Sequence, residues 1–141
     1  MDSLSPESRS ALMAKVKGKN TRPEFAVRAL LHREGFRYRL HSQKLTGRPD
    51  IVLARWKTAI FVHGCFWHRH IGCKLTTSPK SHSDFWQAKF KANVERDARV
   101  KEQLETNGWR VIVVWECETR NHDLLARALS PLFALRQGKI R

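Results

Sequence analysis

The chain has 141 residues, and its 27 lysines and arginines against 13 aspartates and glutamates give a formal net charge of +14 at pH 7. This length predicts one domain over residues 1–141, with a core that needs no disulfides. The charge favours a polyanionic partner such as nucleic acid over the alternative of a merely solvated basic surface. No apolar run approaches the roughly 18 residues of a membrane-spanning helix, and the first residues lack the pattern of a signal peptide. We therefore expect a cytoplasmic protein without a membrane partner.

Residues 1–20 are expected to form a basic arm. Pro6 after Ser5 favours a short helix over residues 6–14. The lysines that follow either lie over nucleic-acid phosphates or belong to a disordered basic tail. They are Lys15, Lys17 and Lys19.

A second helix is predicted to follow the arm. The sequence Thr-Arg-Pro-Glu at residues 21–24 matches a capping box, and Gly35 stands just past the expected end of the helix. Phe25, Leu30 and Leu31 are expected to form its buried side.

Three short strands are predicted next. Residues 36–40 have the pattern of a strand, and residues 45–49 that of a turn. The apolar runs at 50–53 and 58–62 are separated by polar residues, which predicts a strand pair with a tight connection.

The second half of the chain is predicted to hold a long helix and a buried strand. Trp86, Phe90 and Val94 recur every four residues, which predicts a helix over residues 83–107. Residues 109–115 are apolar on both alternating faces apart from one arginine, which is typical of a central, buried strand.

The chain ends in a predicted helix that Asn121 caps and that Pro131 kinks or splits in two. Residues 64–82, in contrast, have no clean period and are expected to form a loop. The order helix, strands, helix, strand, helix predicts an α/β layered domain with a mixed sheet flanked by helices.

The expected loop at 64–82 carries the ligands of a metal site. Cys65, His70 and Cys73, completed by the distant Cys117, form a Cys3His set that uses all the cysteines of the chain. Thiolates and imidazole suit tetrahedral zinc, and four protein ligands leave no open position, so the zinc would be structural. His68 lies within reach and is an alternative to His70. The other interpretation is three small buried thiols and a surface histidine.

A second site is predicted where the two central strands end. The sequence Gly-Arg-Pro-Asp places Asp50 at the start of one strand, and the next strand ends at His63. An acid with a backbone carbonyl can hold Mg²⁺, which keeps several waters, and a histidine can activate the attacking water or protonate the leaving oxygen. The usual acid and lysine of the second strand are replaced by Phe61 and His63. By themselves, these residues also fit an ordinary turn and a buried histidine.

Together these motifs closely resemble the very-short-patch-repair (Vsr) family of DNA mismatch endonucleases. The resemblance covers about residues 20–120. It implies a restriction-endonuclease-like core with a degenerate Pro-Asp…Asp/Glu-x-Lys motif, and Mg²⁺-dependent nicking beside the thymine of a T:G mismatch left by deamination of 5-methylcytosine. The blocks that carry it are Gly47-Arg48-Pro49-Asp50, His63-Gly64-Cys65-Phe66-Trp67-His68, Phe85-Trp86, Asn93-Val94-Glu95-Arg96-Asp97, and Gly108-Trp109-Arg110-Val111 through Trp115-Glu116-Cys117.

The resemblance also implies a role for each site residue. Asp50 and the main-chain carbonyl of Val62 would hold Mg²⁺. His63 and His68 would act as general base and as leaving-group or phosphate partner, in an order that stays open. Further implied roles are an acid that orients a histidine at Asp97, an active-site acid at Glu24, and structural Zn²⁺ at Cys65, His70, Cys73 and Cys117. Apart from the resemblance, we expect DNA-backbone contacts at the basic residues Lys15, Lys17, Lys19 and Arg48.

Phe66, Trp67 and Trp86 match the aromatic wedge of that family. Apolar side chains inserted between base pairs unstack them at a cost that is lower at a mismatch. We expect Phe66 and Trp67 to point outward from the zinc loop, whereas the spacing leaves Trp86 equally compatible with a place in the core.

Three other functions remain open at the level of the sequence. They are a nuclease of this core acting on other DNA, a non-catalytic zinc module that binds DNA, and a nuclease of the His-Cys type in which zinc is only a brace. The resemblance further implies action on double-stranded DNA, with a mismatch-repair ATPase and a cytosine methyltransferase as functional partners. We also expect a monomer.

Overall fold

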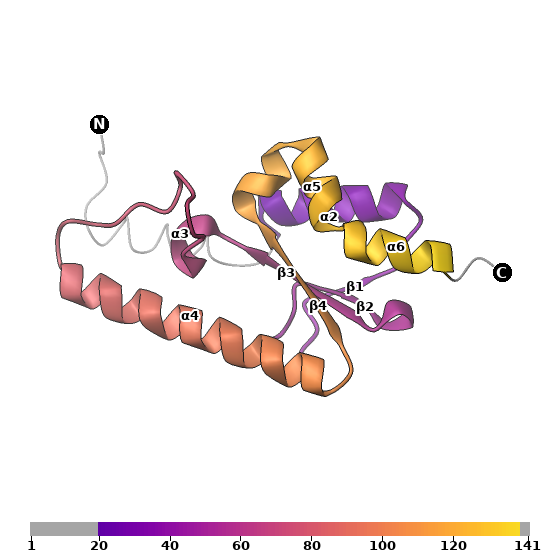
Figure 1. Ribbon diagram of the computed structural model, residues 1–141, viewed down its shortest axis with the longest axis horizontal. Coiled ribbons are helices and arrows are strands. Elements are labelled where there is room, and N and C mark those ends of the chain that lie inside the picture. The colour runs from indigo at the N-terminus through magenta and orange to yellow at the C-terminus, as the bar shows by residue number, and fades with distance from the viewer. Residues whose placement is uncertain (1–19, 139–141) are drawn as a thin grey trace.

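The computed structural model describes residues 20–138 as one mixed α/β unit (Figure 1). Residues 1–19 of the predicted arm, with its helix at residues 6–14 and Lys15, Lys17 and Lys19, lie outside the described residues. The strands are β1 (Arg39–Leu40), β2 (Ile51–Leu53), β3 (Thr58–His63) and β4 (Arg110–Trp115). The helices are α2 (Arg22–Arg33), α3 (Cys65–His68), α4 (Ser83–Thr106), α5 (His122–Ala128) and α6 (Ser130–Gly138), with short 3-10 turns η1 (Ala54–Trp56) and η2 (Glu116–Arg120).

The strands form a mixed four-stranded sheet in the order β1-β2-β3-β4. The pairs β1–β2 and β2–β3 are antiparallel, and β3–β4 is parallel with His63 beside Trp115. The predicted strand pair and its tight connection are thus confirmed, with η1 between the two strands. The predicted central position of residues 109–115 is wrong, because β4 is the last strand of this order. Its apolar character on both faces has another cause: α4 and α5 both pack against it.

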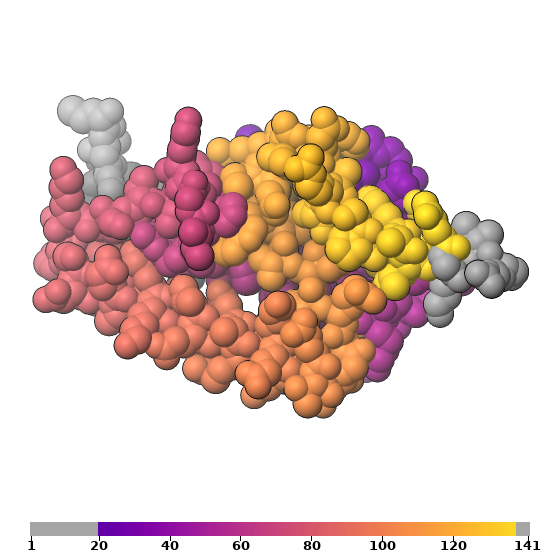
Figure 2. All heavy atoms as spheres, viewed as in Figure 1, coloured from indigo at the N-terminus to yellow at the C-terminus, as the bar shows by residue number. Residues whose placement is uncertain are grey.

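Helices cover both faces of the sheet (Figure 1). The helices α2, α5 and α6 lie on one face, and α4 runs across the other. The space-filling view shows α4 along one side of the molecule, the C-terminal helices on the other, and the segment before α4 at one end (Figure 2). No helix among the described residues is long and apolar enough to cross a membrane. The core joins α2, the strands and the two C-terminal helices through Val27, Leu30, Leu31, Ile51, Leu53, Ile60, Ile112, Val114, Leu125, Leu129 and Leu132.

The N-terminus of α2 has the predicted cap with one difference. Thr21 Oγ1 accepts a hydrogen bond from the Glu24 amide at 3.4 Å, as the capping box requires. The Glu24 carboxylate, however, accepts from the Asn20 amide at 2.6 Å rather than from Thr21. Glu24 is only 3% exposed, so this helix turns an acid inward at its first turn.

Other predicted details of burial are wrong. Phe25 is 52% exposed, because it lies more than 100° around α2 from Leu30 and Leu31. Val94 is also exposed. The strand predicted over residues 36–40 is shorter in the structure, where only β1 (Arg39–Leu40) is a strand. The C-terminal helix does split, since Ser130 starts α6 one residue before Pro131.

The turn before β2 packs closely on α4. Gly47 has φ +78°, a conformation that glycine adopts without strain. A Cβ atom at this position would overlap the side chain of Val100. Glycine therefore lets the turn that leads to Asp50 lie directly against α4.

Candidate functional site

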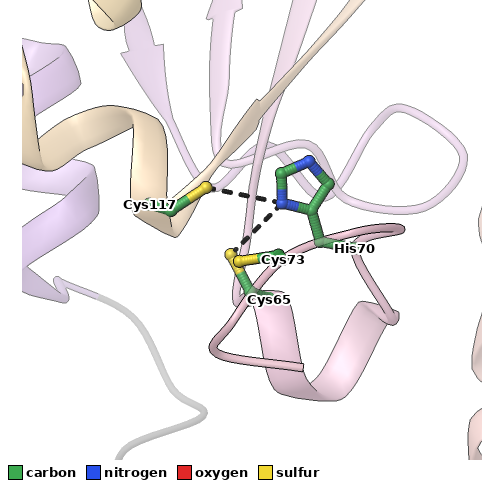
Figure 3. A group of neighbouring side chains, drawn as sticks. All are labelled: Cys65, His70, Cys73 and Cys117. Carbon is green, nitrogen blue, oxygen red and sulfur yellow. Dashed lines mark hydrogen bonds between the residues drawn. The ribbon is translucent and has the colours of Figure 1, made fainter. Parts of the chain in front are cut away.

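Four potential zinc ligands converge from two distant parts of the chain (Figure 3). His70 Nδ1 lies 3.6 Å from Cys65 Sγ and 3.4 Å from Cys117 Sγ. One ligand atom from each residue, Cys73 included, lies within 4.8 Å of all the others. Tetrahedral zinc, with Zn–S about 2.3 Å and Zn–N about 2.0 Å, places its ligand atoms about 3.5–3.8 Å apart. The chemistry and spacing of these donors fit zinc.

The surroundings of this Cys3His group hold its ligands in place. Cys65 begins α3, and its amide donates to Glu116 Oε1 at 3.2 Å. The Trp115 ring stacks on the His70 ring at 4.3 Å. His68, the alternative ligand, points elsewhere and pairs with Asp97.

Protonation of the thiols is coupled to metal binding at this group. Burial raises the pKa of the Cys65 thiol, whereas the Leu75 amide, which donates to Cys73 Sγ, lowers the pKa of Cys73. Since zinc binds thiolates, filling this site would release protons.

Two histidines and an aspartate form a second group at the end of β3. The rings of His63 and His68 stack with centroids 3.8 Å apart and an interplanar angle of 4°. His68 Nδ1 lies 2.6 Å from Asp97 Oδ2, so α3 and α4 meet here through a short hydrogen bond. A carboxylate only accepts, so Nδ1 of His68 donates, and its Nε2 stays available for another contact.

The two histidines differ in their electrostatic surroundings. Burial, with the nearby His68, lowers the pKa of His63 to about 4, so His63 is neutral at pH 7. Burial would raise the pKa of Asp97, but the hydrogen bond and charge of His68 outweigh it and leave that pKa below its ordinary value. Asp97 is thus a carboxylate at neutral pH, and its hydrogen bond goes to His68.

Two acids from different elements form a third group beside β3. Asp50 Oδ2 accepts a hydrogen bond of 2.7 Å from the Val62 amide, which fixes the carboxylate against the strand that leads to His63. Burial raises the pKa of Asp50 to about 7, and the neighbouring Glu24 adds to the rise. Two acids this close, one of them nearly buried, repel each other when both are ionised. A divalent cation bound by oxygen ligands fits this group, since it relieves that repulsion.

The sequence reasoning missed two residues at these acids. Arg28 lies one turn after Glu24 on α2 and donates to Glu24 Oε2 at 3.0 Å. His41, directly after β1, places Nε2 3.2 Å from Glu24 Oε1. The spacing of four between Glu24 and Arg28 could have indicated the first pair. Only the register of β1 against β2 brings His41 beside Asp50, and no sequence motif indicates this contact.

The candidate wedge residues lie in a packed aromatic cluster, and the expectation that Phe66 and Trp67 point freely outward is wrong. Both are half-buried, as is Trp86. The Phe66 ring lies 5.0 Å from Trp67 and 6.0 Å from Trp86, and the buried Phe90 lies beneath them. The contacts come from the long helix α4, whose position the local loop sequence does not reveal.

Polar contacts brace this aromatic cluster. Asn93 Nδ2 donates to the carbonyl of Trp67 at 3.1 Å. The Arg69 guanidinium stacks 4.0 Å from the Phe90 ring and donates to the carbonyl of Thr77 at 2.8 Å. Arg48 lies elsewhere, exposed in the turn before Asp50.

Comparison with known proteins gives matches to a DNA mismatch endonuclease family and to nicking enzymes. A family model described as DNA mismatch endonuclease Vsr matches residues 1–74. The type II nicking enzyme V.XorIIP of Xanthomonas oryzae pv. oryzae is 55% identical over 117 residues, which are 83% of this chain and 85% of that protein. The type II nicking enzyme V.NmeAIP of Neisseria meningitidis is 44% identical over 93% of each chain. The DNA mismatch endonuclease Vsr of Escherichia coli is 40% identical over 84% of this chain and 75% of that enzyme.

Proposed function

Because this chain belongs to the Vsr family of DNA mismatch endonucleases, we propose that it nicks the thymine strand at T:G mismatches left by deamination of 5-methylcytosine. The observation that supports this proposal is that two groups lie at the same end of β3. Asp50, with Glu24 beside it, is bonded to the Val62 amide, and the stacked pair of His63 and His68 begins at the next residue of the strand. We also propose that the chain has a restriction-endonuclease-like core, and its mixed sheet between two helical layers agrees with this.

The acids are proposed to hold a magnesium ion. Asp50 would be one ligand, the main-chain carbonyl of Val62 a second, and Glu24 lies close enough to contribute. When bound, Mg²⁺ neutralises charge on the scissile phosphate and acidifies a bound water. The Val62 amide holds Asp50 in position for this role.

The histidines are proposed to move the proton. Asp97 accepts from His68 Nδ1 and so orients the ring with Nε2 as the proton acceptor, which makes His68 the better general base for the attacking water. His63 stays neutral because burial disfavours its charge, so its ring N–H can donate to a phosphate or to the leaving oxygen. This assignment follows from the difference between the two electrostatic environments.

The aromatic cluster is proposed to be the wedge that tests base stacking. Zinc held by the loop of Cys65 and Cys73 would fix the backbone that carries Phe66 and Trp67. Phe66 packs on Phe90 and Trp67 on Trp86, which gives a preformed edge, so little ordering is required when DNA binds.

Replacing Trp67 by alanine is expected to lower discrimination between mismatched and paired duplexes about tenfold, because unstacking costs less at the mismatch. Affinities for T:G and T:A duplexes of one sequence, measured by fluorescence anisotropy, provide the ratio. Trp67→Phe is the matched control and should keep most of it. Unchanged affinities for both duplexes with Trp67→Ala would remove the wedge from the proposal.

The proposed function is tested by nicking of a labelled duplex with one T:G mismatch in a methyltransferase-like context and Mg²⁺. Matched T:A and C:G duplexes are the controls. A single nick on the thymine strand of the mismatch alone is the expected result. Equal cleavage of all three duplexes would refute mismatch specificity, and binding without cleavage under any divalent cation would refute the nuclease.

A further inference from the structure

His41 reaches the acidic group through the sheet. Leu40 pairs with Ile51 across the β1–β2 ladder, and the next amide, that of His41, donates to the carbonyl of Asp50 at 2.9 Å. His41 is therefore the cross-strand neighbour of Asp50. Its φ is +48°, in the left-handed region that costs energy for residues with a Cβ. Strain of this kind is often found where a side chain must be aimed at a functional site.

The His41 ring faces the two acids. Its Nε2 lies 3.2 Å and 3.3 Å from the two carboxylate oxygens of Glu24. One ligand atom from each of Glu24, His41 and Asp50 lies within 4.8 Å of the others. Neighbouring ligands of an octahedral ion with bonds of about 2.1 Å are about 3 Å apart. The separation between His41 and Glu24, which is that of a hydrogen bond, therefore also fits two neighbouring ligands of one ion.

The charges around this group also suit a cation. Glu24 and Asp50 carry two negative charges when ionised, and Arg28 offsets one of them through Glu24 Oε2 at 3.0 Å. Arg28 Nη2 also lies 3.5 Å from His41 Nε2, which shows that this nitrogen faces the interior of the group. A divalent ion would leave the group with a net positive charge beside an incoming phosphate.

We propose that His41 is a direct ligand of the ion held by Asp50 and Glu24, and that it makes this site prefer first-row transition ions such as Mn²⁺ over Mg²⁺. The inference rests on the proposed function in that the ion at Asp50 is the catalytic one. Mg²⁺ takes oxygen ligands almost exclusively, whereas imidazole nitrogen suits first-row transition ions. The nitrogen ligand therefore sets the choice between ions.

The test measures binding of Mn²⁺ to the full-length, zinc-loaded protein in the absence of DNA. Electron paramagnetic resonance gives the affinity for Mn²⁺, and competition gives that for Mg²⁺. Pulsed measurements detect ¹⁴N coupling from a bound imidazole. His41→Asn tolerates the left-handed backbone, and His41→Gly relieves it altogether. His32→Gln, on an exposed histidine of α2, is the matched control.

We expect His41→Asn and His41→Gly to weaken Mn²⁺ binding about tenfold or more, to weaken Mg²⁺ binding by less than about threefold, and to abolish the ¹⁴N signal. The control should change none of these. Equal losses for both ions would show that His41 only positions Glu24, and a ¹⁴N signal that survives in both variants would show another nitrogen ligand; either overturns the inference. Wild-type protein that binds neither ion but still nicks would overturn it as well.

These outcomes are separate from the test of the proposed function. If T:G duplexes are nicked with Mg²⁺ but the ratio of Mn²⁺ to Mg²⁺ affinity is unchanged in both His41 variants, only the role of His41 is wrong. If the ratio falls as expected but no mismatch is nicked, the metal site stands and the proposed activity does not.

Discussion

Replacing Asp50 by asparagine is expected to lower nicking of a T:G duplex by about 10³-fold or more while leaving DNA affinity within a few-fold, because the carboxylate is the central ligand of the proposed ion. Asparagine has the same shape and can still accept the hydrogen bond from the Val62 amide. The change therefore removes charge and metal affinity without removing the contact that fixes the turn.

The same substitution is expected to stabilise the protein when no ion is bound at Asp50. Burial raises the pKa of Asp50 from 3.8 to about 7, so the folded state binds more protons than the unfolded state between these values. Stability from this group is therefore lost as the pH rises through about 7. At pH 8 the cost is fully present, and Asp50→Asn should raise the free energy of unfolding by a few kcal/mol. At pH 4 the difference should nearly vanish.

Urea unfolding of wild type and variant at pH 4 and pH 8, without added Mg²⁺ or Mn²⁺ and with the same zinc content in both proteins, measures this difference. Nicking with Mg²⁺ measures the activity. Asp123→Asn, at an exposed aspartate of α5, is the matched control and should change neither. Higher stability together with lost activity would show that the acid pair is maintained for chemistry and not for folding. A variant that nicks normally would remove Asp50 from the mechanism.

Local sequence signals predicted the elements that depend on short-range physics. The cap at Thr21, the split near Pro131 and the strand pair around η1 are set by hydrogen bonds and backbone limits within a few residues. The approach of Cys65, His70, Cys73 and Cys117 to one another could be predicted from ligand chemistry, because three thiols and an imidazole together are typical metal ligands. These features were therefore accessible without knowing the tertiary arrangement.

The errors came from features that depend on tertiary packing. The apolar residues on both faces of β4 predict a central strand. Helices that cover both faces, however, give the same pattern to a strand at the end of the sheet. Phe66 and Trp67 were expected to point outward because their loop is irregular, but α4 supplies a packing surface. His41 could not be predicted from the sequence, because only the register of the short strands β1 and β2 brings it beside Asp50.

Removing zinc, or replacing Cys117 by serine, is expected to have the largest effect on stability. Cys117 is the ligand that ties η2, after β4, to the loop that follows β3. Without the metal, the segment at 64–80 keeps the aromatic contacts of Phe66 and Trp67 with α4 but loses the bonds that join it to η2. Its Cys65 thiol then takes up a proton because burial raises its pKa. Since metal binding to such a group is coupled to folding, we expect a loss of about 3–5 kcal/mol for the protein as a whole.

The loss should also be local in character. Hydrogen exchange should rise first at residues 64–80, while amides of β2 and β3 in the core stay protected. Thr119→Ser, which keeps the hydroxyl that donates to the Glu116 carbonyl, is the control for changes in η2. Readdition of Zn²⁺ after chelation should restore protection in the wild-type protein but not in Cys117→Ser. Because α3 carries both Phe66 and His68, the same loosening should lower nicking and mismatch discrimination together. A normal melting curve after complete removal of the metal would show that the four ligands do not brace the loop.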